Sequence, residues 1–131
     1  MGLCQCGALW HSLPFSADGA IVLVSGSPAR KSKPGQIALS SVGGSVEAFV
    51  RALAPEITPR RINLVSPGVI DTPMVQANVA ERDNIYQNMT ANNLIPRAGT
   101  AEEVAQGIVF LVLNDFVTGT TIDVDGGWLL A

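Results

Sequence analysis

The feature that most constrains the fold is a run of aliphatic and small residues at positions 20–25, with the sequence AIVLVS. A continuous apolar run of this length is typical of a β-strand that is buried on both faces. A second run, RINLVS at positions 61–66, predicts another buried strand, which ends at Pro67 and Gly68. A third strand is expected at residues 120–124, where Thr and Asp alternate with inward-facing aliphatic residues.

Segments with helical periodicity separate these strands. Apolar residues recur at helical spacing over residues 39–53, and one or two short helices are expected within the polar residues 71–93. The capping box TAEE opens a helix over residues 100–113, and residues 3–13 show one apolar helical face. Strands that alternate with helices of this length predict an α/β fold: a partial doubly wound, Rossmann-like parallel sheet of about three strands, with helices on both faces.

Length and composition are those of an ordinary globular domain. The 131 residues predict a single domain, and 47% hydrophobic with 15% charged residues exclude a disordered chain. A net charge of −3 gives no basis for holding a phosphate backbone, so nucleic acid is not expected as a partner. No apolar run reaches the roughly 18 to 20 residues that span a bilayer, so we expect no membrane association and a cytoplasmic location.

No metal site is expected from the sequence. Cys4, Cys6 and His11 would supply three zinc ligands, but their spacing matches no common zinc framework and no fourth ligand stands nearby. The two cysteines are expected to be free thiols, because a disulfide between residues so close in the chain would be strained.

Three motifs occur in order along the chain: INLVSPGVIDTP at residues 62–73, IPRAGT at residues 95–100, and VTG with DVDGG at residues 117–127. They resemble, in turn, the sixth strand and its loop, the next helix entry and the last strand of the short-chain dehydrogenase/reductase family. The resemblance covers residues 17–131 and implies that the single domain, residues 1–131, is the C-terminal portion of that fold. A complete sheet of this kind has about six strands, so one edge of the present sheet is expected to be open.

The resemblance implies NAD or NADP as the cofactor, which the chain alone need not bind. In the family, the loop after the sixth strand lies against the nicotinamide end of the cofactor. By resemblance, the Ile70 backbone would meet the carboxamide and Thr72 the nearby phosphates, while Pro67 and Gly68 would shape the turn. The alternative is that these residues only end a strand and begin a helix, as local turn chemistry favours. Residues 73–93 would correspond to the mobile lid over the substrate.

The family's catalytic side chains are missing at the matching positions. Family members use a Tyr to exchange a proton with the substrate, a Lys four residues later to lower the pKa of the Tyr, and a Ser to hold the substrate oxygen. Here Leu39 stands at the position of the Tyr and Gly43 at that of the Lys. Gly26 stands at the position of the Ser, so a shift by one residue to Ser25 or Ser27 would restore the serine alone. No catalytic residue is therefore assigned.

Other parts of a complete cofactor enzyme are also missing from the sequence. Tyr86 is the chain's only tyrosine and lies in the lid segment, where nothing basic stands at a fixed spacing to tune it. No Gly-rich turn follows an opening strand, and no acidic residue stands about 20 positions later for the ribose. Any cofactor affinity is therefore expected to be weak.

Gly43 and Gly44 lie inside the expected helix, where each costs about 1 kcal/mol relative to Ala. They would allow close helix-to-helix approach in a dimer, or they reflect drift to small residues beside the lost catalytic positions.

Three hypotheses stay open for the whole chain. It is an oxidoreductase subunit or gene fragment that another chain completes, a non-catalytic interaction protein, or a shortened product of a longer reading frame. The expected partner is a second copy or a complete family member.

Overall fold

The computed structural model describes residues 16–75 and 78–131. Its three strands form one parallel sheet in the order β1-β2-β3. They are β1 (Ala20–Val24), β2 (Arg61–Pro67) and β3 (Thr121–Val124). Each strand matches an expected one to within one residue at either end. The register places Leu64 of β2 opposite Leu23 of β1 and Thr121 of β3.

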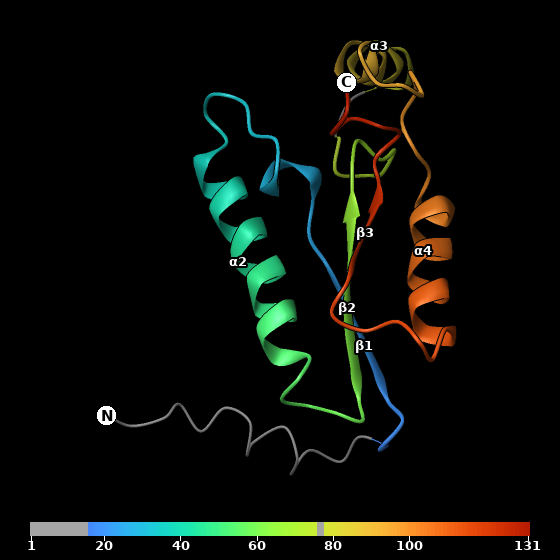
Figure 1. The fold of residues 1–131 in the computed structure, drawn as a ribbon. Coiled ribbons are helices and arrows are strands. Elements are labelled where there is room, and N and C mark those ends of the chain that lie inside the picture. The colour runs from blue at the N-terminus through green and yellow to red at the C-terminus, as the bar shows by residue number, and fades with distance from the viewer. Residues whose placement is uncertain (1–15, 76–77) are drawn as a thin grey trace.

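Helices cover both faces of this sheet (Figure 1). α2 (Ile37–Leu53) lies on one face and α4 (Ala101–Leu113) on the other. The 3₁₀ helix η1 (Ser27–Ala29) follows β1, and α3 (Val79–Thr90) lies beyond the carboxyl ends of the strands. The capping box is present, with Thr100 Oγ1 accepting from Glu103 N–H at 3.3 Å and Glu103 accepting from Thr100 N–H at 2.8 Å. The partial doubly wound α/β fold is therefore confirmed, while the helix expected in residues 3–13 lies outside the described residues.

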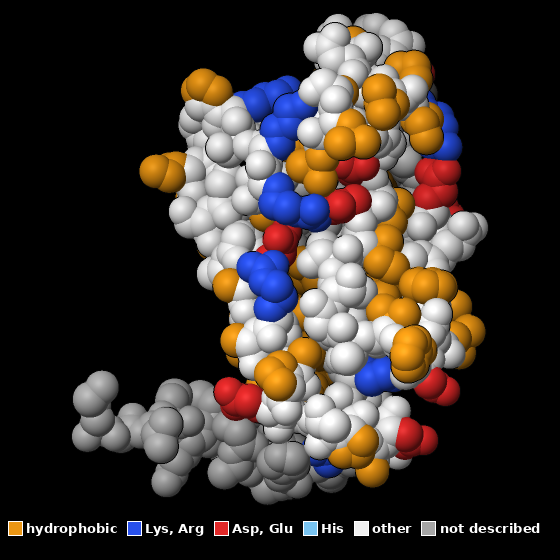
Figure 2. Space-filling view, viewed as in Figure 1, with side chains coloured by type: hydrophobic (Ala, Val, Ile, Leu, Met, Phe, Trp, Pro, Cys, Tyr) orange, Lys and Arg blue, Asp and Glu red, His pale blue; other side chains and the backbone are white. Residues whose placement is uncertain are grey.

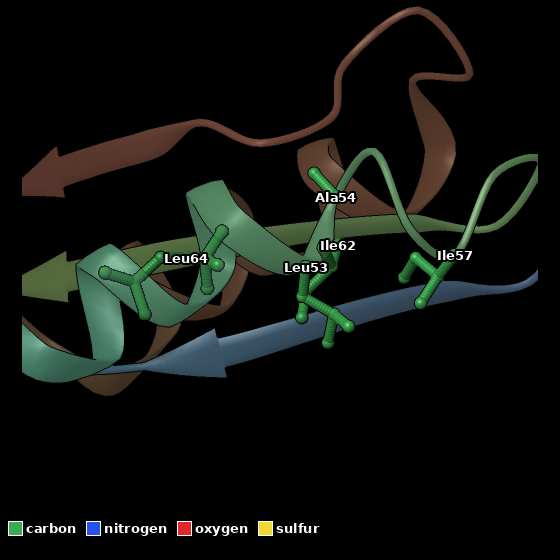
Figure 3. Close-up of a cluster of buried hydrophobic side chains, with 6 residues drawn as sticks. Leu53, Ala54, Ile57, Ile62 and Leu64 are labelled. Atoms are coloured by element: carbon green, nitrogen blue, oxygen red, sulfur yellow. The ribbon is translucent and has the colours of Figure 1, made fainter. Parts of the chain in front are cut away.

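The main hydrophobic core lies between α2 and the sheet (Figure 3). Its buried members are Val50, Leu53, Ala54, Ile57, Ile62 and Leu64. Burial of each large aliphatic side chain contributes about 1.5 to 3 kcal/mol, so this cluster fixes α2 on β2. On the opposite face, α4 packs so closely that a Cβ at Gly107 would lie 3.2 Å from Val124 Cγ2.

The apolar stripe expected along α2 is divided between two faces of the helix. Leu39, Val42 and Phe49 are 63%, 64% and 46% exposed, although they share helical spacing with the core residues. Gly43 and Glu47 are buried instead, Gly43 against Ala29 and Glu47 in an ion pair with Arg30. The reason is that the loop after β1 approaches the first half of α2 too closely for a large side chain. One apolar face of α2 is consequently left without cover within the described chain.

β1 is less buried than its aliphatic sequence indicates. Its first four residues are only half-buried and Val24 is 55% exposed, so the expectation of burial on both faces is wrong. The cause is its place at the edge of the sheet, where β2 is its one strand neighbour among the described residues. The open edge expected for an incomplete sheet therefore runs along β1.

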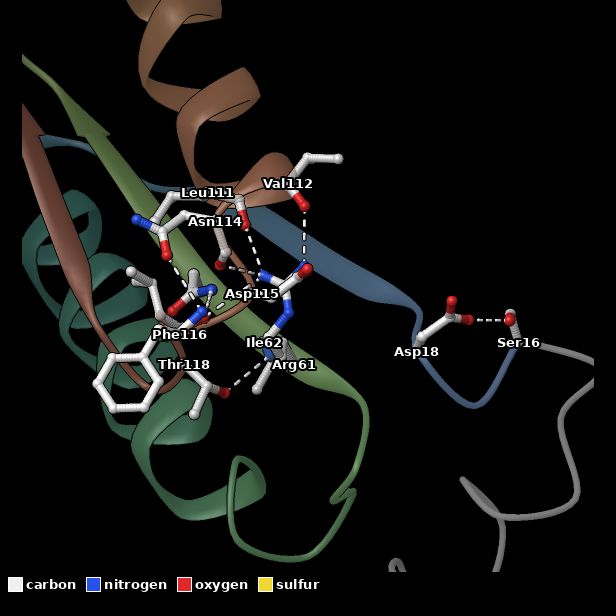
Figure 4. A network of polar contacts seen from close by, with 12 residues as sticks. Ser16, Asp18, Arg61, Ile62, Leu111, Val112, Asn114, Asp115, Phe116 and Thr118 are labelled. Atoms are coloured by element: carbon white, nitrogen blue, oxygen red, sulfur yellow. Dashed lines mark hydrogen bonds and ion pairs between the residues drawn. The ribbon is translucent and has the colours of Figure 1, made fainter.

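Arg61, the first residue of β2, joins the sheet to the end of α4 (Figure 4). Its guanidinium donates hydrogen bonds to the carbonyls of Leu111 and Val112, each at 2.8 Å, and of Asn114 at 3.0 Å. It also pairs with the Asp115 carboxylate at 3.1 Å. Carbonyls in the last turn of a helix have no partner within the helix, so Arg61 satisfies groups that would otherwise need water.

Candidate functional site

A cavity of about 650 Å³ opens at the carboxyl ends of β1 and β2. In open α/β sheets, ligands bind at this end of the strands. The cavity is bounded by the end of β1, the loop after β2, and residues of α3 and α4, and its size is usual for a small-molecule site. All four residues that the sequence assigns to the cofactor line it: Pro67, Gly68, Ile70 and Thr72.

The backbone of Ile70 presents two unpaired groups at the cavity wall. Ile70 and Gly99 form a parallel bridge, whose hydrogen bonds run from Asp71 N–H to Gly99 C=O at 2.8 Å and from Gly99 N–H to Val69 C=O at 2.9 Å. In this pattern the N–H and C=O of Ile70 itself point away from Gly99. Neither group has a hydrogen-bond partner within the described part of the chain. Ile70 therefore offers one free donor and one free acceptor.

Pro67 and Gly68 are held in a turn that leaves no space for a larger residue. Ser27 Oγ donates to Pro67 C=O at 3.0 Å, and Gly68 N–H donates to Val124 C=O at 3.0 Å. A Cβ at Gly68 would lie 2.7 Å from Asp125 Cα and 2.9 Å from Asp125 O. The turn after β2 needs glycine because the turn after β3 passes directly against it.

Tyr86 joins α3 to the loop after β2. Its hydroxyl accepts from Thr72 N–H at 3.2 Å and donates to Thr72 C=O at 3.3 Å. Arg82, one helical turn earlier, also bonds Thr72 C=O at 3.2 Å, pairs with Asp71, and lies 5.9 Å from the centre of the Tyr86 ring. Interaction with Tyr86, and then the charge of Asp71, raises the pKa of Arg82. The expectation that nothing basic stands at a fixed spacing from Tyr86 is therefore wrong.

These contacts also define what Tyr86 can do. Both hydrogen-bonding functions of its hydroxyl are engaged by the backbone of Thr72. In this arrangement Tyr86 positions α3 over the cavity and has no proton free for a substrate. The hydroxyl of Thr72, by contrast, has no partner in the described residues and belongs to the cavity lining.

The positions that match the family's Tyr, Lys and Ser lie close to the cavity. Leu39 and Gly26 line it, and so does Ser25, whose buried hydroxyl has no hydrogen-bond partner among the described residues. A Cβ at Gly43 would lie 2.8 Å from Ala29 Cβ and 3.0 Å from Ser25 Oγ. The segment around η1 thus occupies the space that a lysine at this position would enter. The close approach that Gly43 permits is to its own chain.

Two further findings concern residues 16–75 and 78–131, which the structure describes. Within them, no helix combines the length and the apolar content needed to cross a bilayer. No group of three or more His, Cys, Asp or Glu side chains suited to a metal ion occurs in the same segments. Cys4, Cys6 and His11 lie outside them.

Glu103 fixes the segment that forms the bridge with Ile70. Its carboxylate accepts hydrogen bonds from Arg97 at 2.6 and 3.0 Å and from Thr100 N–H at 2.8 Å. The bonds from Arg97, and then the bond from Thr100, lower the pKa of Glu103 to about 2. The ionised carboxylate therefore holds together the start of α4 and the loop that precedes it.

We expect this carboxylate to contribute to stability at neutral pH. Because its pKa is lower in the folded chain than the ordinary 4.5, the contribution is complete above pH 4.5 and is lost as the pH falls through about 2. The effect is small because the group is exposed to solvent. Urea unfolding of the wild type and of Glu103→Gln should give different midpoints at neutral pH, and the difference should shrink in acid. A difference that does not depend on pH would contradict this account.

Comparison with known proteins identifies a family. Residues 5–129 match a family model described as enoyl-(acyl carrier protein) reductase. Carbonyl reductase family member 4 of Danio rerio is 39% identical over 117 residues, which are 86% of this chain and 46% of that protein. Short-chain dehydrogenase/reductase ATR9 of Stachybotrys chlorohalonatus is 34% identical over 111 residues, 85% of this chain and 44% of the relative. The chain spans about half the length of the curated relatives that it matches.

Solved structures agree with this assignment. A small-chain dehydrogenase in complex with NADPH superposes with a TM-score of 0.80 at 35% identity, over 86% of this chain and 52% of that one. The MalC reductase/Diels-Alderase from Malbranchea aurantiaca gives a TM-score of 0.81 at 27% identity, over 92% of this chain and 46% of its own. The family match covers nearly the whole chain, and the parallel three-stranded sheet agrees with it. The chain belongs to the short-chain dehydrogenase/reductase family.

Proposed function

We propose that this chain provides the nicotinamide-facing half of an NAD(P)-dependent oxidoreductase and that it is inactive by itself. The observation that carries the proposal is the unpaired N–H and C=O of Ile70 beside the cavity. A primary carboxamide, such as that of nicotinamide, has an acceptor oxygen and an NH₂ donor, so it complements this pair. The complex of a related dehydrogenase with NADPH supports the same class of cofactor for this chain.

The surroundings of Ile70 also suit a nicotinamide nucleotide. Thr72 adds a hydroxyl without a protein partner in the described chain, which suits a phosphate oxygen. When bound, the cofactor would supply or accept the hydride. The chain's part would be to orient the carboxamide at Ile70 and to exclude water with apolar side chains such as Leu39 and Val104.

Inactivity of the chain alone is proposed because the side chain that donates the proton in the family is replaced here by Leu39. A carbonyl that accepts a hydride becomes an alkoxide, which must then be protonated. Leu39 has no exchangeable proton, and the hydroxyl of Tyr86 is engaged by the backbone of Thr72. The phosphate-binding turn is missing from the sequence, so cofactor affinity would depend on contacts at one end of the molecule. A second copy or a complete family member that pairs with the open edge of β1 would supply the missing contacts.

Fluorescence titration with NADPH tests this proposal. We expect weak but saturable binding, and Thr72→Val should weaken it by roughly two- to tenfold, the worth of one hydrogen bond. Ser45→Ala, which removes a hydroxyl from α2 outside the cavity lining, is the control and should bind as the wild type does. The chain alone should not oxidise NADPH in the presence of carbonyl compounds. Unchanged affinity in Thr72→Val, or carbonyl reduction by the isolated chain, would overturn the proposal.

A second candidate function is a non-catalytic interaction protein derived from the same fold. Apolar side chains gather on the outer side of α4 (Figure 2). Val109, Phe110, Leu113 and Phe116 are 52%, 48%, 73% and 100% exposed. Such a surface on a folded domain favours association with another protein. Assembly into a defined oligomer without any NADPH binding would favour this candidate over the first.

A further inference from the structure

The cavity contains one charged side chain, which indicates the kind of substrate that it accepts. Lys33 is the only charged residue among the described residues that line it. The side chains around it are mostly apolar. They include Leu39, Val75, Met74, Met89, Val104 and Trp128. A single cation at an apolar cavity attracts an anionic group and repels a cationic one.

The ammonium group of Lys33 is available to a ligand. It has no hydrogen-bond or ion-pair partner in the described part of the chain. The neighbouring Lys31 is engaged, because its Nζ donates to Trp128 C=O at 3.0 Å and lies 5.3 Å from the centre of the Trp128 ring. Of these two lysines, only Lys33 lines the cavity and has no partner in the described part of the chain.

Gln36 places a second donor beside Lys33. Its Oε1 accepts from Lys33 N–H at 2.9 Å, and its backbone N–H donates to Lys33 C=O at 3.1 Å. Because Oε1 is occupied, the Nε2 amide group remains as a donor at the cavity lining. The two oxygens of a carboxylate match the two donors from Lys33 and Gln36. The positive end of α2 follows directly, and the first turn of α2 contains no acidic residue.

We infer that the cavity binds a substrate with an apolar body and one carboxylate group, which Lys33 and Gln36 hold. The inference rests on the proposed function, since it places this substrate in the cavity that Ile70 shares. Met74 and Met89 line the part of the cavity that receives the apolar body, and their flexible thioethers adapt to its shape. Apolar oxo acids and hydroxy acids belong to this substrate class.

Three decyl probes test the inference. Decanoate, decanol and decylamine share one chain and differ in the charge of the head group. Trp10→Phe makes Trp128 the sole tryptophan, and Trp128 lines the cavity, so its fluorescence reports occupancy. We expect decanoate to bind about tenfold more tightly than decanol, and decylamine to bind more weakly than either.

Variants at Lys33 locate the carboxylate. Lys33→Met should weaken decanoate binding about tenfold and change decanol binding by less than about twofold. Lys33→Arg should retain most of the preference for decanoate. Arg51→Met removes the same charge from a side chain that is 60% exposed and outside the cavity lining, and it should change neither affinity. Equal binding of the three probes, no binding of decanoate, or an equal loss in Arg51→Met would overturn the inference.

NADPH titration of the same preparations separates this inference from the proposed function. A preference for decanoate without NADPH binding would overturn the cofactor proposal and leave the anion site supported. NADPH binding without a preference for decanoate would overturn the inference alone.

Discussion

Replacing Arg61 by alanine is expected to lower the free energy of unfolding by about 3 to 5 kcal/mol, a large fraction of the stability of a typical domain. The guanidinium donates to the carbonyls of Leu111, Val112 and Asn114, and only 10% of the Arg61 side chain is exposed. Its loss would leave these carbonyls without a donor and open a space between β2 and α4. The ion pair with Asp115 adds little, because that carboxylate is 94% exposed.

Two further variants show whether geometry or charge carries the effect. Arg51→Ala removes one arginine whose side chain is 60% exposed, and it should cost less than about 1 kcal/mol. Arg61→Lys keeps the charge but not the planar fork, so it should recover only part of the loss. Urea unfolding followed by circular dichroism measures all three, and amide exchange should show the end of α4 opening first in Arg61→Ala. Equal losses for Arg61→Ala and Arg51→Ala would contradict the assignment.

The strands and the start of α4 were predictable because their determinants are local. The aliphatic run of β1 and the RINLVS run of β2 specify extended structure through residues adjacent in the chain. The side chains of Thr100 and Glu103 each accept a hydrogen bond from the other's backbone N–H within one helical turn, so the sequence alone predicts the capping box. The cofactor role of the loop that contains Ile70 stays a prediction from its motif, and the structure adds that the N–H and C=O of Ile70 have no partner in the described part of the chain.

What the sequence could not show depends on residues far apart in the chain. Burial of β1 was overestimated because an aliphatic run does not reveal whether a neighbouring strand is present. The division of the α2 stripe depends on η1, which approaches the helix at Gly43. Arg61 opens the RINLVS run that predicts β2, yet the partners of its guanidinium lie 50 to 56 positions later in the chain. Burial, and hydrogen bonds between residues distant in the chain, are set by the packed fold.

The catalytic positions illustrate the same limit. The sequence places Leu39 and Gly43 where the family has its Tyr and Lys. It does not show whether the surroundings of these two positions differ as well. In the structure, a Cβ at Gly43 would lie 2.8 Å from Ala29 Cβ and 3.0 Å from Ser25 Oγ, so a lysine at this position would require the segment around η1 to move. The contact between Arg82 and Tyr86 was within reach of the sequence, since the two residues are one helical turn apart, but its role emerged only from their shared bond to Thr72.

Gly68→Ala is expected to lower the free energy of unfolding by about 2 to 3 kcal/mol. The same substitution should also lower the affinity for NADPH. The added Cβ would lie 2.7 Å from Asp125 Cα and 2.9 Å from Asp125 O, which are backbone atoms that cannot rotate aside. Asp125 is itself fixed, because its carboxylate accepts from Gly127 N–H at 2.8 Å and from Leu129 N–H at 3.0 Å. The clash must therefore separate the turns after β2 and β3, and the displacement would reach Ile70 through the loop.

Gly44→Ala provides the matched control, because it adds the same methyl group where space exists. The nearest atom to a Cβ at Gly44 is Ala29 O, at 4.0 Å. Alanine is favoured over glycine inside a helix, so this variant should gain up to about 1 kcal/mol. The two substitutions should therefore move the urea midpoint in opposite directions. If Gly68→Ala proved as stable as the wild type, the turns after β2 and β3 would not be in contact as described, and the placement of Ile70 at the cavity would lose its support.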